Sequence, residues 1–167
     1  MDDVEEQQNH AKLMVSIWEK TIDLQIHFNE MCLTLRRTAV TAIGVTLGAG
    51  ALAFRFGGNV AIAGSVVSVA FLFVLVGLAL CIAFFLMDRY WYHELLRASV
   101  GYAEDMEQPA KALGLPCPLD LSRKIRERNQ EGWLGSGGTK IVAFYAIIAV
   151  GLAIAASLLL CGVIRPA

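Results

Sequence analysis

The sequence predicts an all-α integral membrane protein with three transmembrane helices and long cytoplasmic helical extensions. The chain has 167 residues, 56 % of them hydrophobic, and a mean hydropathy of +0.56. It carries 14 basic and 15 acidic side chains, but residues 38–54, 56–87 and 141–164 contain no charged residue and no histidine. A bilayer is crossed by roughly 20 apolar helical residues. This pattern excludes a soluble enzyme, a disordered charged chain and a secreted disulfide scaffold.

The first segment, residues 1–37, is predicted to be a cytoplasmic amphipathic helix. It has no Gly or Pro between Val4 and Arg37, so the helix is expected to run from about residue 4 through the first span to about residue 54. Apolar residues recur every three or four positions, as in a heptad seam that only Thr21 interrupts. This seam packs either on another helix of the same chain or on neighbouring subunits. Its members are Met14, Ile17, Thr21, Leu24, Phe28, Met31 and Leu35.

Residues 38–87 are predicted to form a transmembrane hairpin of two spans. Gly57, Gly58 and Asn59 mark the turn, so the second helix is expected from Val60 to Met87. Pairs of small residues four apart let helices in lipid approach closely. One such pair lies in the first span and one in the second. We expect these pairs to make contacts either within the hairpin or between subunits. These pairs are Gly44 with Gly48 and Gly64 with Ser68.

The middle segment, residues 88–140, is expected to be cytoplasmic and helical. Its first aromatic residues are typical of a membrane interface, and an amphipathic helix should follow to about Gln108, where Pro109 ends it. A later basic helix is expected to contact either anionic lipid headgroups or a phosphate-bearing signal such as a nucleotide. No nucleic-acid partner is expected at a net charge of −1. The basic residues are Arg123, Lys124, Arg126 and Arg128.

The third span, residues 141–164, follows a Gly-rich joint at residues 132–138. Cytoplasmic loops of membrane proteins are enriched in Lys and Arg. Residues 1–37 and 88–140 carry twelve of these residues, against Arg55 and Arg165 elsewhere. The N-terminus should therefore be cytoplasmic, and the C-terminus should lie on the outer side of the membrane. The first span is expected to act as its own insertion signal.

The spans offer little chemistry. Ion-coupled transporters usually place ionisable residues within the membrane, and these spans hold none. A pore would need an oligomer, lined by the few hydroxyl side chains available. The four cysteines and three histidines are scattered, so no metal, cofactor or catalytic residue is predicted and the chain is not expected to be an enzyme. The hydroxyl residues are Thr41, Thr46, Ser65 and Ser157.

Residues 19–29 (EKTIDLQIHFN), 36–39 (RRTA), 87–93 (MDRYWYH) and 139–145 (TKIVAFY) resemble small bacterial membrane proteins similar in layout to the SLATT-type defence-associated effectors. The third span departs from that layout. The resemblance implies a homo-oligomer of a bacterial inner membrane, with its C-terminus in the periplasm, that forms a pore or disrupts the membrane in anti-phage defence. The alternative is a membrane anchor or adaptor whose cytoplasmic helices dock a soluble protein partner.

Overall fold

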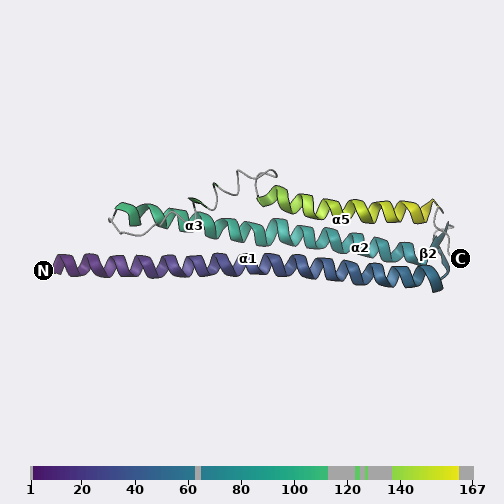
Figure 1. Ribbon diagram of the computed structural model, residues 1–167, viewed down its shortest axis with the longest axis horizontal. Helices are drawn as coiled ribbons and strands as arrows, with labels where there is room; N and C mark the ends of the chain where they lie inside the picture. Colours follow the sequence, from purple (N-terminus) through teal and green to yellow (C-terminus); the bar gives the residue numbers. More distant parts are fainter. Residues whose placement is uncertain (1, 63–64, 113–122, 125–126, 128–136, 162–167) are drawn as a thin grey trace. The chain divides into compact units, whose positions relative to one another are not determined.

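The computed structural model describes residues 2–62, 65–112, 123–124, 127 and 137–161. Within them, three helical segments are long and apolar enough to cross a membrane, which confirms the predicted helical class and the three candidate spans. The elements are α1 (Asp2–Phe56), β1 (Asn59–Ile62), β2 (Ser65–Ser68), α2 (Val69–Met87), the π-helix η1 (Asp88–Tyr92), α3 (His93–Ala112) and α5 (Gly137–Leu160) (Figure 1).

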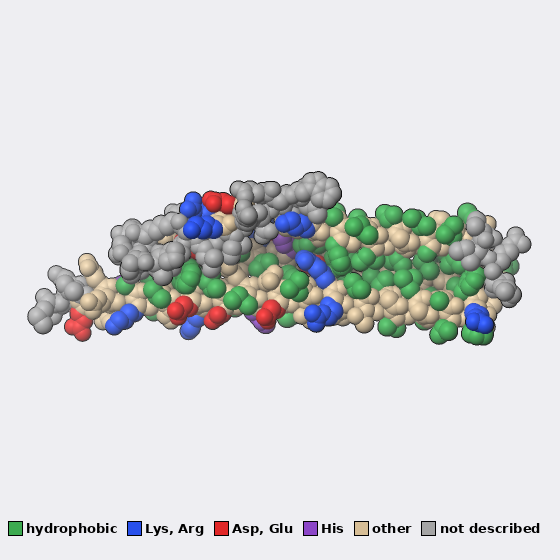
Figure 2. Space-filling model, in the orientation of Figure 1, with side chains coloured by type: hydrophobic (Ala, Val, Ile, Leu, Met, Phe, Trp, Pro, Cys, Tyr) green, Lys and Arg blue, Asp and Glu red, His purple; other side chains and the backbone are tan. Residues whose placement is uncertain are grey.

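The chain divides into two compact units. One, here called the polar unit, comprises Met1–Leu33 and Tyr90–Lys140; the other, the apolar unit, comprises Thr34–Arg89 and Ile141–Ala167. In Figure 2 charged side chains lie along the first half of α1, whereas hydrophobic side chains gather over α2 and α5. Helix α1 belongs to both units, because it runs without a break through residues 33 and 34.

Helix α1 spans 55 residues, as the uninterrupted sequence predicts. It ends where two glycines follow each other. The Gly57 N–H donates to the carbonyl of Ala53 at 2.7 Å, and a Cβ at Gly57 would lie 2.6 Å from that same oxygen. Gly58 adopts a positive φ of 64°, which other residues rarely adopt. Only glycine fits both positions, so the chain turns here.

The predicted helix start at Val60 is wrong. A two-stranded antiparallel hairpin follows the turn, with Asn59 opposite Ser68 and Val60 opposite Val67. β-Branched residues favour strands, which explains why this Val- and Ile-rich stretch is extended although it is apolar enough for a helix. Helix α2 begins only at Val69, where the Ser68 hydroxyl accepts a hydrogen bond from the Ala70 N–H at 3.3 Å.

Helix α3 continues beyond the end that the sequence predicts for it. Pro109 lies inside the helix, which extends to Ala112. Proline removes one backbone donor, but its fixed φ is helical, so a helix near its end tolerates it at the loss of one hydrogen bond. The Gly-rich joint at residues 132–138 lies outside the described residues except for Gly137 and Gly138, which already belong to α5.

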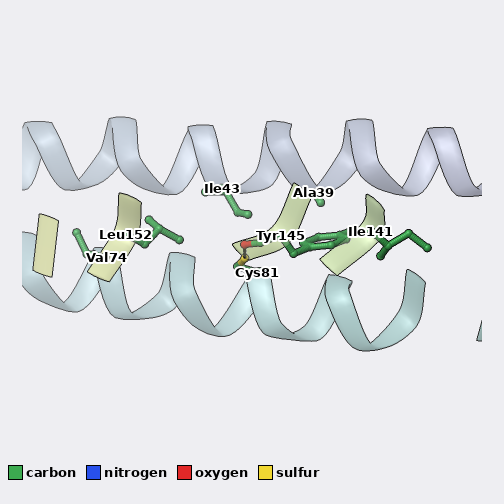
Figure 3. Packing of buried hydrophobic residues seen from close by; sticks show 7 residues of the cluster. All are labelled: Ala39, Ile43, Val74, Cys81, Ile141, Tyr145 and Leu152. Atoms are coloured by element: carbon green, nitrogen blue, oxygen red, sulfur yellow. Dashed lines mark hydrogen bonds between the residues drawn. The ribbon is translucent and has the colours of Figure 1, made fainter. Parts of the chain in front are cut away.

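The core of the apolar unit is formed by three helices that lie side by side (Figures 1 and 3). Helix α1 contributes small and branched side chains, α2 contributes Val74 and Cys81, and α5 contributes the largest side chain, Tyr145. All are buried, so the space between the spans is filled by side chains. The cluster consists of Ala39, Ile43, Val74, Cys81, Ile141, Tyr145 and Leu152.

Candidate functional site

The apolar unit contains a buried ion pair that links α1 to the end of α2. Arg36 Nε donates to Asp88 Oδ2 at 2.6 Å, and Arg36 Nη2 donates to Asp88 Oδ1 at 3.2 Å. The Asp88 side chain is fully buried, whereas the Arg36 side chain remains 30 % exposed. A two-pronged contact of this kind is among the strongest that a guanidinium makes. The pair therefore fixes α1 against the α2 helix.

The backbone around Asp88 explains how its carboxylate reaches the interior. Asp88 caps α2, and its N–H is shared between the carbonyls of Phe84 and Phe85. The next residues form the π-helix η1 rather than a further α-helical turn. A π-helix inserts one extra residue into a helix and rotates the turns after it, and such segments are frequent at functional sites. The pair was not predicted from the sequence, although two oppositely charged residues at the ends of two adjacent spans were a signal for it.

Tyr145 on α5 brings the third helix to the same place. Its side chain is 2 % exposed, and its ring packs edge-on against Phe85 and Phe144, with centroids 5.7 and 5.0 Å away. Its hydroxyl lies close enough to Asp88 and Arg36 to interact with both electrostatically. Within the described part of the chain, however, that hydroxyl is buried without a hydrogen bond of standard length. We call Arg36, Asp88 and Tyr145 the polar cluster.

The predicted small-residue pair on the first span faces away from the other described parts of the chain. A Cβ built on Gly44 or on Gly48 would meet no atom within 4 Å. The chain uses other glycines for its internal contacts. Gly50 lies against Phe73, and Gly77 lies against the side chains of Leu152 and Thr46. Gly44 and Gly48 are therefore open to whatever surrounds the protein.

The predicted pair in the second span does not exist as a helical motif. Ser68 is the residue before α2, and Gly64 lies outside the described residues. The helical register that would place them on one face is absent at Ser68, because strand β2 ends there. In the third span Gly151, like Gly44, has no atom within 4 Å of a Cβ position.

The hydroxyl residues proposed to line a pore are not brought together. Thr41, Thr46 and Ser157 each donate to the carbonyl four residues earlier in their own helix, at 2.8–3.0 Å. Thr46 is half-buried beside Gly77, while Thr41 and Ser157 are exposed. Ser65 lies in strand β2 and not in a spanning helix. Within the described chain, each of these three helical hydroxyls donates to a backbone carbonyl of its own helix.

The heptad seam on α1 is inward at five of its seven predicted positions, Leu35 included, and departs from the prediction at two. Met14, Ile17 and Phe28 are half-buried and Thr21 is buried, but Leu24 and Met31 are 52 % and 36 % exposed. The inward positions are instead the residues that follow them. Gln25 Nε2 donates to the Ser99 carbonyl of α3 at 3.3 Å, and Cys32 is 3 % exposed. At these two steps the packing buries Gln25 and Cys32 and leaves the seam residues before them exposed.

Part of the predicted basic helix is described. Arg123 and Lys124 are exposed, and Arg123 pairs with Glu127 at 3.3 Å, one helical turn away. Arg126 and Arg128 lie outside the described residues. Exposed pairs of this kind contribute little to stability. Within the described ranges, no group of three or more His, Cys, Asp or Glu side chains lies close enough to hold a metal ion.

Comparison of the chain with protein-family models, with curated proteins and with solved structures gave no match.

Proposed function

We propose that this chain is a self-associating membrane effector whose copies assemble through the outward face of α1. The apolar unit would cross a bacterial inner membrane with its three helices, and the polar unit would lie in the cytoplasm as helical extensions. The outward position of Gly44 and Gly48 carries the proposal, because the chain leaves this close-approach surface unused internally. In lipid, small residues are what lets two helices pack tightly.

The packing of the apolar unit supports an oligomer over a conducting monomer. The side chains of Ile43, Val74 and Leu152 fill the space between the spans. Any aqueous path would therefore run between copies, or the assembled helices would perturb the bilayer around them. A path lined by these helices would be mostly apolar, which favours a dewetted, closed state at rest. The resemblance to SLATT-type effectors adds a role in anti-phage defence to this proposal.

The test is the mass of the purified chain in nanodiscs, combined with membrane potential in expressing cells. The wild type should be oligomeric and should depolarise the membrane. Gly44→Leu/Gly48→Leu should be monomeric and silent, because two leucines block the close approach. Val76→Leu is the matched control, since Val76 is 51 % exposed on α2, away from the proposed face, and should tolerate the change. A monomeric wild type that leaves the potential intact would overturn the proposal.

A second candidate is an anchor or adaptor that docks a soluble protein. The observation that favours it is a set of large apolar side chains exposed on α1 in the polar unit, among them Leu13, Ile26 and Leu33, each more than half exposed. Exposed apolar surface in water often marks an interaction site. Replacing residues 38–54 by an unrelated apolar helix of equal length separates the two candidates, because an adaptor should keep its activity and the proposed effector should lose it.

A further inference from the structure

In the polar unit, the outward side of α1 carries two separate apolar edges. Leu24 and Ile26 are both more than half exposed, and they stand on either side of Gln25, which is turned toward α3. An α-helix turns by about 100° per residue, so these two side chains lie about 160° apart across the outward side. The same arrangement recurs seven residues later, where two exposed apolar residues flank a buried one: Met31, Cys32 and Leu33.

The edge that contains Leu24 carries the positive charge of this stretch. Lys20 lies four residues before Leu24 and His27 lies three residues after it, so the three side chains share one edge of the helix. Met31 continues the edge by four residues, and all four side chains are exposed. Lys20 is a cation, and His27 adds a second positive charge when it is protonated. We call this row the basic edge.

The edge that contains Ile26 carries only acids between residues 19 and 33. Asp23 lies three residues before Ile26 and Glu30 lies four residues after it, and both are exposed. Glu19 lies a further four residues before Asp23 on the same row. We call this row the acidic edge. It ends at Leu33, because the next charge along the row, Arg37, belongs to the apolar unit.

The sign of these charges decides which edges can meet. Copies that enter a membrane in the same orientation bring their α1 helices together in parallel. Two basic edges or two acidic edges would then place like charges at the same level, which is unfavourable. A basic edge against an acidic edge instead sets Lys20 beside Asp23 of the next copy and His27 beside Glu30. One offset of three residues, about 4.5 Å along the axis, satisfies both pairs.

We propose that α1 joins copies of this chain head to tail, with the basic edge of one copy on the acidic edge of the next. The edges lie on opposite sides of the helix, so one neighbour covers only one edge and each chain needs two neighbours. Such contacts close into a ring of more than two copies. This inference rests on the proposed self-association and specifies its geometry. A second copy fits better than an unrelated protein, because each edge is complementary in charge to the other edge of the same chain.

The first experiment reverses one charge and measures subunit number by native mass spectrometry of the full chain in mild detergent. The wild type should contain more than two copies. Asp23→Lys should weaken association about tenfold, because the altered edge meets Lys20 of the next copy, and adding Lys20→Asp should restore it. Asp105→Lys is the matched control, since Asp105 is an exposed acid of α3. Circular dichroism should show equal helicity in all variants.

The second experiment reads the geometry by cysteine cross-linking in membranes, in a chain whose four native cysteines are replaced by alanine. Glu30→Cys alone and His27→Cys alone should give no cross-linked product, because like edges do not meet. Co-expression of the two variants with different tags should give a product that carries both tags.

The outcomes separate this inference from the proposed function. Cross-linking of either single-cysteine variant with itself would overturn the head-to-tail contact, and so would a wild type that stops at two copies. An oligomeric wild type that Asp23→Lys affects no more than Asp105→Lys would overturn it as well. These three results leave the proposed self-association in place, whereas a monomeric wild type overturns both.

Discussion

At the scale of single residues, the Arg36–Asp88 pair is asymmetric. The carboxylate is completely buried, while the guanidinium retains a 30 % exposed surface. Burying an unpaired charge is expensive, whereas a charge that reaches water or headgroups is not. Removing either residue should therefore cost a different amount of folding stability. Without Arg36 the buried Asp88 carboxylate has lost its cation, whereas without Asp88 the Arg36 guanidinium keeps part of its solvation.

We expect Arg36→Ala to lower the free energy of unfolding by about 3–5 kcal/mol and Asp88→Ala to lower it by clearly less. The measurement is denaturation by sodium dodecyl sulfate from mild detergent, followed by circular dichroism, with the double variant closing a thermodynamic cycle. Arg37→Ala is the control, because Arg37 is exposed on the next position of the same helix. A larger loss for Asp88→Ala than for Arg36→Ala would contradict this account.

Tyr145 gives an internal check on the polar cluster. Its hydroxyl is buried without a hydrogen bond of standard length in the described structure. No hydrogen bond of standard length is lost and the ring contacts with Phe85 and Phe144 are kept, so in the same denaturation experiment Tyr145→Phe should change the free energy of unfolding by less than about 1 kcal/mol.

At the scale of elements, the turn after α1 depends on backbone geometry more than on hydrophobicity. Gly57 has no room for a Cβ beside the Ala53 carbonyl, and Gly58 has a positive φ. These glycines predicted the turn correctly from the sequence. The strands after the turn were not predicted, because an apolar run of this kind fits a buried helix and a strand equally well by periodicity.

Glycine-to-alanine changes should therefore act in opposite directions at two positions. Gly57→Ala should destabilise the protein by more than about 1 kcal/mol, because the new methyl group meets a backbone oxygen. Gly101→Ala should stabilise it by about 0.5–1 kcal/mol, since Gly101 lies within α3 and has no atom within 4 Å of its Cβ position. Thermal unfolding midpoints of the two variants in the same detergent check both signs. If Gly57→Ala raised the unfolding midpoint, the turn would have room for a side chain at this position and the prediction would be wrong.

The heptad seam on α1 belongs to the same scale. Spacing predicted the buried face of this helix at five of seven positions, and it missed the inward residue at two. Gln25 and Cys32 are inward while Leu24 and Met31 are exposed. The Gln25 hydrogen bond to the Ser99 carbonyl is a contact between residues 74 positions apart, and no local pattern encodes it.

At the scale of the whole molecule, the separation of polar and apolar units makes topology testable through the native cysteines. Cys161 at the end of α5 is exposed, whereas Cys32 and Cys81 are buried. A membrane-impermeant maleimide reports which exposed thiols face the outside of an intact membrane. Cys117 lies outside the described residues and is best replaced by serine.

In a Cys117→Ser background, Cys161 should be labelled by the impermeant maleimide in intact spheroplasts. Leu24→Cys, in a chain that also carries Cys161→Ser, should be labelled only after permeabilisation, because Leu24 is exposed on the proposed cytoplasmic part of α1. Cys32 and Cys81 should stay unreactive until the protein is denatured. Labelling of Leu24→Cys in intact spheroplasts would reverse the proposed orientation.

The sequence by itself determined the three apolar helices and the break after α1. A spanning helix satisfies its backbone hydrogen bonds within one segment and excludes charge along its length, so both properties can be read locally. Only the tertiary structure decided that Gln25 and Cys32 lie inward on α1, that Gly44 and Gly48 lie outward, and that Arg36 pairs with Asp88. These depend on contacts between helices remote in sequence, where side-chain size and the extra residue in η1 set which groups meet.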